Sequence, residues 1–462
     1  MEEREINPNP VYYDFHGDFP PVEFEPGRPA YIPDESPQTH PKRITDTTFR
    51  DGSQDPRFAL FPHETKLRYF DLLHKLDNGT GRIENLEVFI YQKRDQWVLE
   101  KLLERGYEFP RVTTWTRATP KDIKLLVRLS QGQVKETGLL ASASDHHIFD
   151  RLKYPSKEIA VEKYLVPILA ALENGIRPRI HLEDATRADI PGWVIPFMKR
   201  VTKATEGKAC FRVCDTIGWG VSDPRARPPI GIPKLITILR EETGAELEFH
   251  GHNDFGLATA NSIAAWVYGC NRVNATFAGM GERTGNTSLE QMVAAVIRFF
   301  GDPGFDLHVL AEIANLISKE VHPISSRAPI IGQAIFTTQA GLHQTGVKRH
   351  AEAPGGLIYL PYSPSVVGRE EVELHRIGGL TGMEGLVAIL NQELEAKGEH
   401  GRYTLVSKTV KQVYDRVHEE YDGTWDEEKN VFVKLRTSFF EPQELMAMAK
   451  EVERGEDSKM VE

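Results

Sequence analysis

The sequence predicts an α/β fold, a (β/α)8 TIM barrel followed by a small helical C-terminal subdomain. Eight β-rich runs alternate with amphipathic segments at a spacing of roughly 30 residues, which is the pattern of a barrel of parallel strands. Nearly every run ends in a polar or charged residue, as expected where eight strand ends converge on one site. The alternation stops after residue 303. A doubly wound open sheet is the competing architecture.

The chain begins with a segment, residues 1–40, that contains eight prolines interleaved with aromatic residues. Proline at this density prevents a regular helix or a central strand. The aromatic side chains favour an extended arm that lies against a surface over a freely disordered tail.

The barrel is expected to occupy residues 41–303. Its strands are predicted to begin near Arg43, Glu84, Arg111, Val134, Arg177, Cys210, Ala245 and Arg272. Helical patterns, with apolar residues at i, i+3 and i+4, cover residues 63–76, 96–105, 120–129, 156–174, 192–205, 232–243 and 257–268.

The remainder of the chain predicts two further parts. Residues 304–370 contain one helix, 306–320, and a linker rich in proline and glycine at 351–369. Residues 371–462 predict a helical C-terminal subdomain and tail, with helices at 380–398 and 404–421 and fraying after Glu451.

Composition excludes several classes of partner. The 462 residues carry 56 Lys+Arg against 67 Asp+Glu, a formal net charge of −11 that argues against nucleic acid or an anionic membrane surface. The apolar runs are too short for a membrane helix, and the N-terminus has no pattern of a secretion signal. Three cysteines fit a reduced compartment. We expect a cytoplasmic protein.

The strongest local signal is His250-Gly251-His252 at the end of the seventh predicted strand. Residues i and i+2 of a strand point to the same face, so both imidazoles can reach one metal ion. The alternative is a pair of exposed or core histidines around a tight glycine.

Two loops add candidate ligands. Asp46–Gln54 leaves the first strand and contains the adjacent Arg50 and Asp51, which otherwise form a surface ion pair of little value. Gly279–Thr287 follows the eighth strand; it lacks the lysine and the glycine spacing of nucleotide-binding loops, but Asn286 offers a carbonyl oxygen. Asp51, His250, His252 and Asn286 form a mixed nitrogen and oxygen set that suits Mn²⁺, Mg²⁺, Co²⁺, Fe²⁺ or Zn²⁺ with open positions.

These motifs resemble a known family. The segments Asp46–Gln54, His250–Asp254, Gly281–Asn286 and Gly341–Gln344 are similar to the signature set of the metal-dependent barrel enzymes that include isopropylmalate, homocitrate and citramalate synthases and hydroxymethylglutaryl-CoA lyase. The resemblance covers residues 43 to about 345. Residues 135–149, 181–190 and 74–76 are most similar to the Re-type citrate synthases.

The resemblance implies a divalent metal, with Mn²⁺ first, and acetyl-CoA as co-substrate. It implies Asp51, His250 and His252 as metal ligands, Asn286 as a ligand or close neighbour, and Arg50 as the catalytic arginine. His343 matches a histidine that enters the partner subunit's active site for proton transfer, which implies a homodimer. Without the family, a lone histidine in a glycine-flanked turn is more often structural.

Further residues are expected in the barrel mouth. Glu183 and Glu87 resemble acidic residues of the family that point there, and Glu183 is expected to be catalytic together with Arg50 and His343. Carboxylates paired with arginines are an equal alternative. Arg117 and Arg187 are candidates for gripping a distal carboxylate. Expected to bind substrate are Gln54, Glu87, Arg117, Ser144, His146 and Arg187. Polar strand ends favour oxaloacetate or 2-oxoglutarate over 2-oxoisovalerate.

The expected function is therefore a Claisen-type condensation by an acyltransferase that joins acetyl-CoA to a 2-oxo acid, with oxaloacetate giving citrate. The alternatives are homocitrate or 2-isopropylmalate synthesis, and retro-Claisen cleavage by an acyl-CoA lyase. Asp145-His146-His147 also fits a metal-dependent phosphoesterase, but no further Asp/His clusters occur at matching spacing. A binding protein without activity would require all the metal-site motifs to be coincidental.

Overall fold

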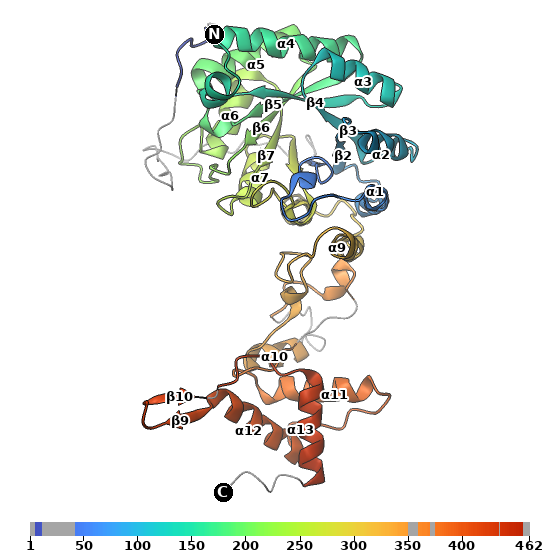
Figure 1. Cartoon of the computed structure of the whole chain (residues 1–462), viewed down its shortest axis with the longest axis vertical. Coiled ribbons are helices and arrows are strands. Elements are labelled where there is room, and N and C mark those ends of the chain that lie inside the picture. The colour runs from blue at the N-terminus through green and yellow to red at the C-terminus, as the bar shows by residue number, and fades with distance from the viewer. Residues whose placement is uncertain (1–4, 12–41, 350–358, 370–374, 434, 456–462) are drawn as a thin grey trace. The chain divides into compact units, whose positions relative to one another are not determined.

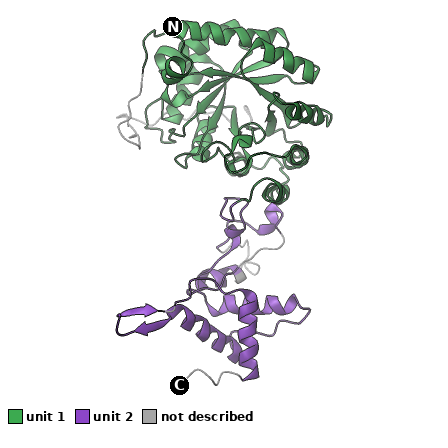
Figure 2. Cartoon of the chain, viewed as in Figure 1, with its two compact units in different colours: residues 1–324 green, residues 325–462 purple. Residues whose placement is uncertain are grey.

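The computed structural model describes residues 5–11, 42–349, 359–369, 375–433 and 435–455 (Figure 1). The chain divides into two compact units, residues 1–324 and 325–462 (Figure 2). Most of the predicted arm, residues 12–40, and part of the predicted linker, residues 350–358, lie outside the described residues.

The first unit contains a closed barrel of eight parallel strands in sequence order. The strands are β1 (Arg43–Asp46), β2 (Ile83–Val88), β3 (Arg111–Thr116), β4 (Glu136–Ser142), β5 (Arg177–Glu183), β6 (Cys210–Asp215), β7 (Glu246–Gly251) and β8 (Arg272–Ala275). The predicted barrel is confirmed, and the open sheet is wrong because β1 pairs with β8 along its whole length.

Helices surround this barrel (Figure 1). They are α1 (His63–Asp77), α2 (Lys93–Leu103), α3 (Pro120–Ser130), α4 (Lys157–Glu173), α5 (Ile195–Ala204), α6 (Ile232–Thr243), α7 (Ala258–Val267), α8 (Leu289–Phe300) and α9 (Val309–Glu320). Local sequence explains where several begin: the Thr119 side chain accepts from the Asp122 N–H at the start of α3, and Ser156 does the same for Ile159 in α4.

The barrel interior carries charges where such barrels usually hold branched apolar side chains. Arg179, Arg212, Glu87 and Glu248 are all fully buried. Arg212 lies 2.9 Å from a carboxylate oxygen of each glutamate, and Arg179 also donates to Glu87. Buried charges are tolerated when they are paired and hydrogen-bonded. The network holds the Glu87 carboxylate in one position in the barrel interior.

The unit boundary differs from the predicted one, which placed residues 304–370 together. Helix α9 belongs with the barrel because its apolar face is buried and its ends are tied to α1. The Asp306 N–H donates to Leu76 O at 3.1 Å, and the Thr65 hydroxyl donates to Glu320 at 2.8 Å. The unit therefore ends at Ile324 rather than at residue 303.

The second unit contains α10 (Gly341–Arg349), α11 (Met383–Glu395), α12 (Lys408–Asp422), α13 (Pro442–Arg454) and the hairpin of β9 (Thr424–Asp426) and β10 (Val431–Val433). The two predicted helices are present as α11 and α12, which pack with α13 around Leu390, Val413 and Leu445. The hairpin and α13 were not expected. A signal for α13 is present, because Glu441 before its first residue and Glu444 in its first turn form a capping box.

The predicted fraying after Glu451 is wrong for the first residues of that stretch, since α13 continues to Arg454. None of the described helices has the length and apolarity needed to cross a membrane.

Candidate active site

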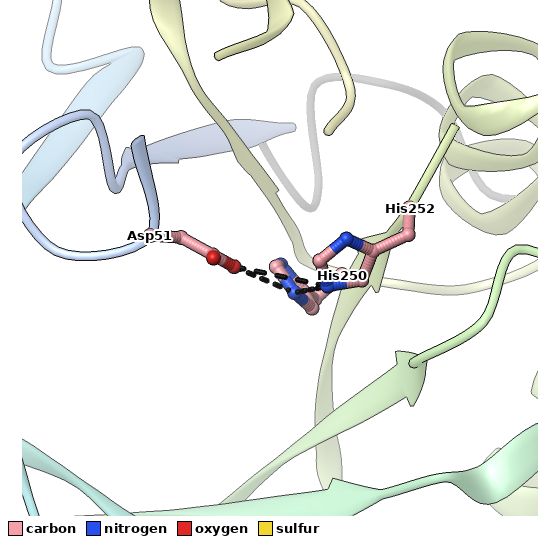
Figure 3. A group of neighbouring side chains, drawn as sticks. All are labelled: Asp51, His250 and His252. Atoms are coloured by element: carbon pink, nitrogen blue, oxygen red, sulfur yellow. Dashed lines mark hydrogen bonds and ion pairs between the residues drawn. The ribbon is translucent and has the colours of Figure 1, made fainter. Parts of the chain in front are cut away.

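Three predicted ligands meet at the carboxyl ends of the strands. Asp51 lies in the loop after β1, His250 is in β7, and His252 follows β7 directly. Figure 3 shows the three side chains pointing toward one another. Their ligand atoms all lie within 4.8 Å of one another, and they are the one group of this kind among the described residues. The i, i+2 spacing thus places both imidazoles on one face, as the sequence predicted.

The hydrogen bond behind His250 leaves its lone pair facing this group. Nδ1 of His250 lies 2.6 Å from Oδ1 of Asn274, which accepts only, so Nδ1 carries the proton. Nε2 of His250 therefore points a lone pair at Oδ2 of Asp51, 3.1 Å away, and at Nε2 of His252, also 3.1 Å away. Acceptors that converge in this way are suited to a cation.

The protonation states agree with a metal centre. Burial is the main cause that lowers the pKa of His252, to about 4, so this imidazole is neutral at physiological pH. Burial opposes ionisation of Asp51, but the Arg50 guanidinium beside it favours the charged form, and the pKa of its carboxyl lies below the ordinary value. Metal ligation requires a neutral imidazole and an ionised carboxylate.

Asn286 joins the group through the glycine-rich loop. A bridge pairs its backbone with that of His252. Its Nδ2 donates to Met280 O at 2.9 Å, while its buried Oδ1 has no hydrogen-bond partner among the described residues. A Cβ on Gly281, which has φ +150°, would lie 2.1 Å from Nδ2 of Asn286, so the loop needs glycine there. The free oxygen makes the donor set fit a divalent metal.

Arg50 lies against both the ligands and the buried network. Its Nη1 is 3.1 Å from Oδ2 of Asp51, and its Nε is 3.8 Å from Oε1 of Glu87. The guanidinium lies over the Trp115 ring at 4.9 Å. Thr47 donates to Glu87 at 3.1 Å and helps hold that carboxylate. The predicted Arg50 and Glu87 are therefore brought to one place, with Glu87 orienting the arginine.

A second cluster lies at the ends of β4 and β5. Oε2 of Glu183 accepts from the Ser142 hydroxyl at 2.8 Å and lies 3.2 Å from Nδ1 of His147; Arg151 also donates to it. Burial would raise the pKa of Glu183, but the bonds from His147 and Arg151 lower it to about 2. Glu183 is thus an ionised carboxylate that lies against the Arg151 guanidinium and the His147 imidazole.

Three other predicted residues border this cluster. Ser144 donates to Oδ2 of Asp184 at 2.5 Å, and Arg187 grips the same carboxylate, with its Nε at 2.9 and 3.0 Å from the two oxygens. His146 lies 3.8 Å from Asp150, and burial together with Arg187 lowers its pKa. Arg187 is therefore already engaged by a carboxylate of the protein.

Two other predicted residues of the first unit, Gln54 and Arg117, are not brought into contact with either group. Gln54 is exposed at the end of a short 3-10 turn, Gly52–Gln54. The Arg117 side chain is 64% exposed and pairs with Asp122 at 3.3 Å. His343 is exposed in α10 of the second unit, where its ring stacks on Tyr359 with centroids 4.1 Å apart. It lies in a helix rather than in a turn.

Sequence reasoning missed four residues that contact the site: Asn274, Trp115, His147 and Arg151. Asn274 could have been found from its strand, because Arg272 faces the buried glutamates and i+2 points the same way. His147 and Arg151 lie on a π-helical turn, His146–Arg151, whose spacing no ordinary pattern predicts.

The comparisons with known proteins agree with this geometry. The chain is 40% identical over 367 residues to a citrate (Re)-synthase of Clostridium kluyveri, covering 77% of this chain and 78% of that protein. It is 35% identical to a citrate (Re)-synthase of Syntrophus aciditrophicus, covering 80% of this chain and 59% of that longer protein. A homocitrate synthase of Methanothermobacter thermautotrophicus is 31% identical over 71% of this chain and 79% of its own length.

The family model named HMGL-like matches residues 42–317, which are the barrel and most of α9. Asp51, His250, His252 and Asn286 all fall inside the matched range. The resemblance noted from the motifs is thereby confirmed, and the chain belongs to the HMGL-like family.

Proposed function

We propose that this protein catalyses a Claisen-type condensation of acetyl-CoA with a 2-oxo acid, and that oxaloacetate is its substrate and citrate its product. The observation that carries the proposal is the convergence of Asp51, His250 and His252 beside the guanidinium of Arg50. Two relatives that cover more than three quarters of this chain bear the name citrate (Re)-synthase.

Asp51, His250 and His252 would hold a divalent ion, with the free oxygen of Asn286 adjacent. A bound divalent ion supplies Lewis-acid polarisation of the keto oxygen and a template for the 2-oxo acid. The mixed nitrogen and oxygen donors suit Mn²⁺.

The condensation forms one carbon–carbon bond. A base removes a proton from the methyl group of acetyl-CoA, the resulting carbanion adds to the keto carbon, and the keto oxygen becomes an alkoxide that is then protonated. Water hydrolyses the thioester and releases free CoA. Arg50 stabilises the negative charge that develops on the keto oxygen, because its guanidinium is fixed by Asp51, Glu87 and Trp115 before the reaction.

The second cluster favours a dicarboxylic oxo acid. Ser142, His147, Arg151 and Glu183 make the wall at the ends of β4 and β5 polar. These groups already pair with one another, so a branched apolar side chain would lie against a polar surface and would not find an apolar pocket there. A second carboxylate on the oxo acid suits this polar wall better, because Arg151 is a charged donor within it.

The test is release of free CoA from acetyl-CoA with Mn²⁺, using oxaloacetate, 2-oxoglutarate, 2-oxoisovalerate, pyruvate and glyoxylate in separate assays. We expect oxaloacetate to give the highest kcat/KM and citrate to be the product. Fastest turnover of 2-oxoglutarate would replace the proposal with homocitrate synthesis, which the 31% identical relative makes the second candidate. Cleavage of an acyl-CoA without condensation would indicate a lyase instead.

We also propose that the enzyme is a homodimer in which His343 acts in proton transfer at the partner's site. Its exposure and its place in the Gly341–Gln344 motif support this role. Arg50→Ala and His343→Ala should each be inactive. Refolding the two variants together at equal ratio should restore about a quarter of the wild-type activity, since half the dimers are mixed and each has one intact site. No recovery in verified mixed dimers contradicts the sharing of His343.

The buried, unpaired cysteines Cys210, Cys214 and Cys270 fit a protein of the reducing cytoplasm, which we propose as its location.

A further inference from the structure

We propose that the segment Glu5–Val11 is a positioning strap, which ties together the loops after β4 and β5 and thereby holds His147 and Arg151 against Glu183. The proposal rests on the proposed function for its effect on substrate, but its structural part can be tested without substrate. The segment is part of the first unit, and in Figure 1 it starts near one end of α4 at the top of the view.

The sequence of the strap prepares it for this role. In Asn7-Pro8-Asn9-Pro10-Val11 every second residue is proline, which has a fixed φ and no N–H. A residue that precedes proline is also restricted to extended conformations. The prolines therefore reduce the conformational entropy that the segment loses on docking. A bend at Asn9, whose N–H donates to Oδ1 of Asn7 at 3.0 Å, further fixes its path.

The first half of the strap contacts the loop after β5. The Asn7 N–H donates to Gly192 O at 2.7 Å, and the Asn7 side-chain amide donates to Oδ2 of Asp189 at 3.0 Å. A Cβ on Gly192 would lie 3.0 Å from Cβ of Asn7, so the two chains are in close contact. Asp189 is only 7% exposed and also accepts from the Gly192 N–H at 2.9 Å.

The second half covers a buried ion pair in the loop after β4. Nζ of Lys157 lies 2.9 Å from Oδ1 of Asp145, and both side chains are fully buried. The strap supplies a backbone partner to each member: the Val11 N–H donates to Oδ2 of Asp145, and Lys157 donates to Asn9 O at 3.4 Å. A buried ion pair is stable only when its remaining donors and acceptors are satisfied.

Both anchors lie next to proposed substrate groups. Asp145 directly precedes the π-helical turn that carries His147 and Arg151, and Asp189 lies two residues after Arg187. Glu183 ends β5 and is held to the end of β4, where the Ala143 N–H donates to Glu183 O at 2.7 Å, whereas the π-helical turn lies in the loop beyond β4. The position of the turn relative to Glu183 therefore depends on what holds that loop. The strap contacts one loop at each end, and its loss would let the turn move away from Glu183.

The test compares Val11→Pro with Val11→Ala in the full-length chain. Val11→Pro removes the N–H that donates to Asp145, whereas Val11→Ala keeps it. The first readout is hydrogen exchange of residues 145–151 in the enzyme without substrate. We expect Val11→Pro to speed exchange there about 10- to 100-fold, the effect of losing one hydrogen bond to a charged group, and Val11→Ala to leave it unchanged. Unchanged exchange in a folded Val11→Pro variant overturns the strap.

The second readout separates positioning from general destabilisation. We expect Val11→Pro and Asn7→Ala to raise KM for oxaloacetate about fivefold to tenfold, while kcat and Mn²⁺ affinity stay within about twofold of wild type. A parallel fall of Mn²⁺ affinity would show that the barrel as a whole is disturbed and would overturn the positioning role. If no 2-oxo acid is turned over at all, the proposed function fails, and faster exchange in Val11→Pro still supports the structural strap.

Discussion

The Nε2 atoms of His250 and His252 lie 3.1 Å apart, and both face Oδ2 of Asp51, at 3.1 and 3.9 Å. The proton of His250 is on Nδ1, which faces Asn274, so the lone pair of Nε2 is directed at Oδ2 of Asp51. A bound cation would remove the repulsion between these two acceptors and would be ligated by their lone pairs. Residues around the ligands should therefore matter nearly as much as the ligands themselves.

Asn274→Ala should weaken metal binding. Asn274 fixes the tautomer and ring orientation of His250 through the 2.6 Å bond to Nδ1. Loss of such a partner typically lowers metal affinity about 10- to 100-fold. We expect this loss in Mn²⁺ titrations followed by electron paramagnetic resonance.

The matched control is Asn261→Ala. Asn261 is also fully buried, and its amide donates to Gly220 O at 2.7 Å. Its replacement should lower the thermal midpoint of unfolding and leave Mn²⁺ affinity unchanged. Equal Mn²⁺ affinities for Asn274→Ala and wild type would contradict the role given to Asn274.

Arg50→Lys should lower kcat for CoA release about 10²- to 10³-fold, with a much smaller change in KM for the oxo acid. Lysine keeps the positive charge but lacks the planar fork that reaches Asp51 and Glu87 together while lying over Trp115. Arg43→Lys is the control, because Arg43 pairs with Glu84 through a partly exposed side chain in β1. A kcat close to wild type in Arg50→Lys would mean that charge alone suffices.

The barrel and the convergence of His250 and His252 could be predicted because they rest on periodicity. The i, i+2 rule places His250 and His252 on one face, and alternation of strands and helices closes the sheet. The fold of the second unit was predicted less well, since β9 and β10 have three residues each and leave no clear pattern.

The polar wall at the ends of β4 and β5 was predicted only in outline, because the side-chain directions there do not follow ordinary strand or helix periodicity. Which of His146 and His147 faces Glu183 depends on the π-helical turn, whose i to i+5 bonds rotate side chains away from ordinary helical positions. Arg117 follows directly after β3, which ends at Thr116, and Asp122 at the start of α3 holds it outside both groups. Competition from a nearby carboxylate cannot be read from strand periodicity.

His147→Ala should raise KM for the oxo acid about tenfold, and His146→Ala should change it less than about twofold. Nδ1 of His147 lies 3.2 Å from Glu183, whereas His146 contacts Asp150 on the outer part of the same turn. Steady-state kinetics of the two single variants distinguish the two histidines, because each variant removes one of two adjacent imidazoles and the KM values can be compared directly. A larger effect of His146→Ala would restore the residue predicted from the sequence.

Glu290→Gln should make unfolding less dependent on pH. Glu290 is 1% exposed in the first turn of α8 and accepts from the Ala278 N–H at 2.9 Å, and burial, with a smaller effect of Asp46, raises its pKa from 4.5 to about 7. The folded state therefore binds a proton that the unfolded state releases between these pH values. The associated stability is complete below pH 4.5 and is lost as pH rises to about 7, which amounts to about 3 kcal/mol.

Glutamine keeps an acceptor for Ala278 without the charge. Urea unfolding at pH 4.5 and pH 8 should therefore show the free energy of unfolding of Glu290→Gln gaining on that of wild type by about that amount. Glu312→Gln removes an exposed carboxylate from the equivalent first turn of α9 and should show no such gain. Parallel pH profiles for Glu290→Gln and wild type would mean that Glu290 is ionised in the folded protein.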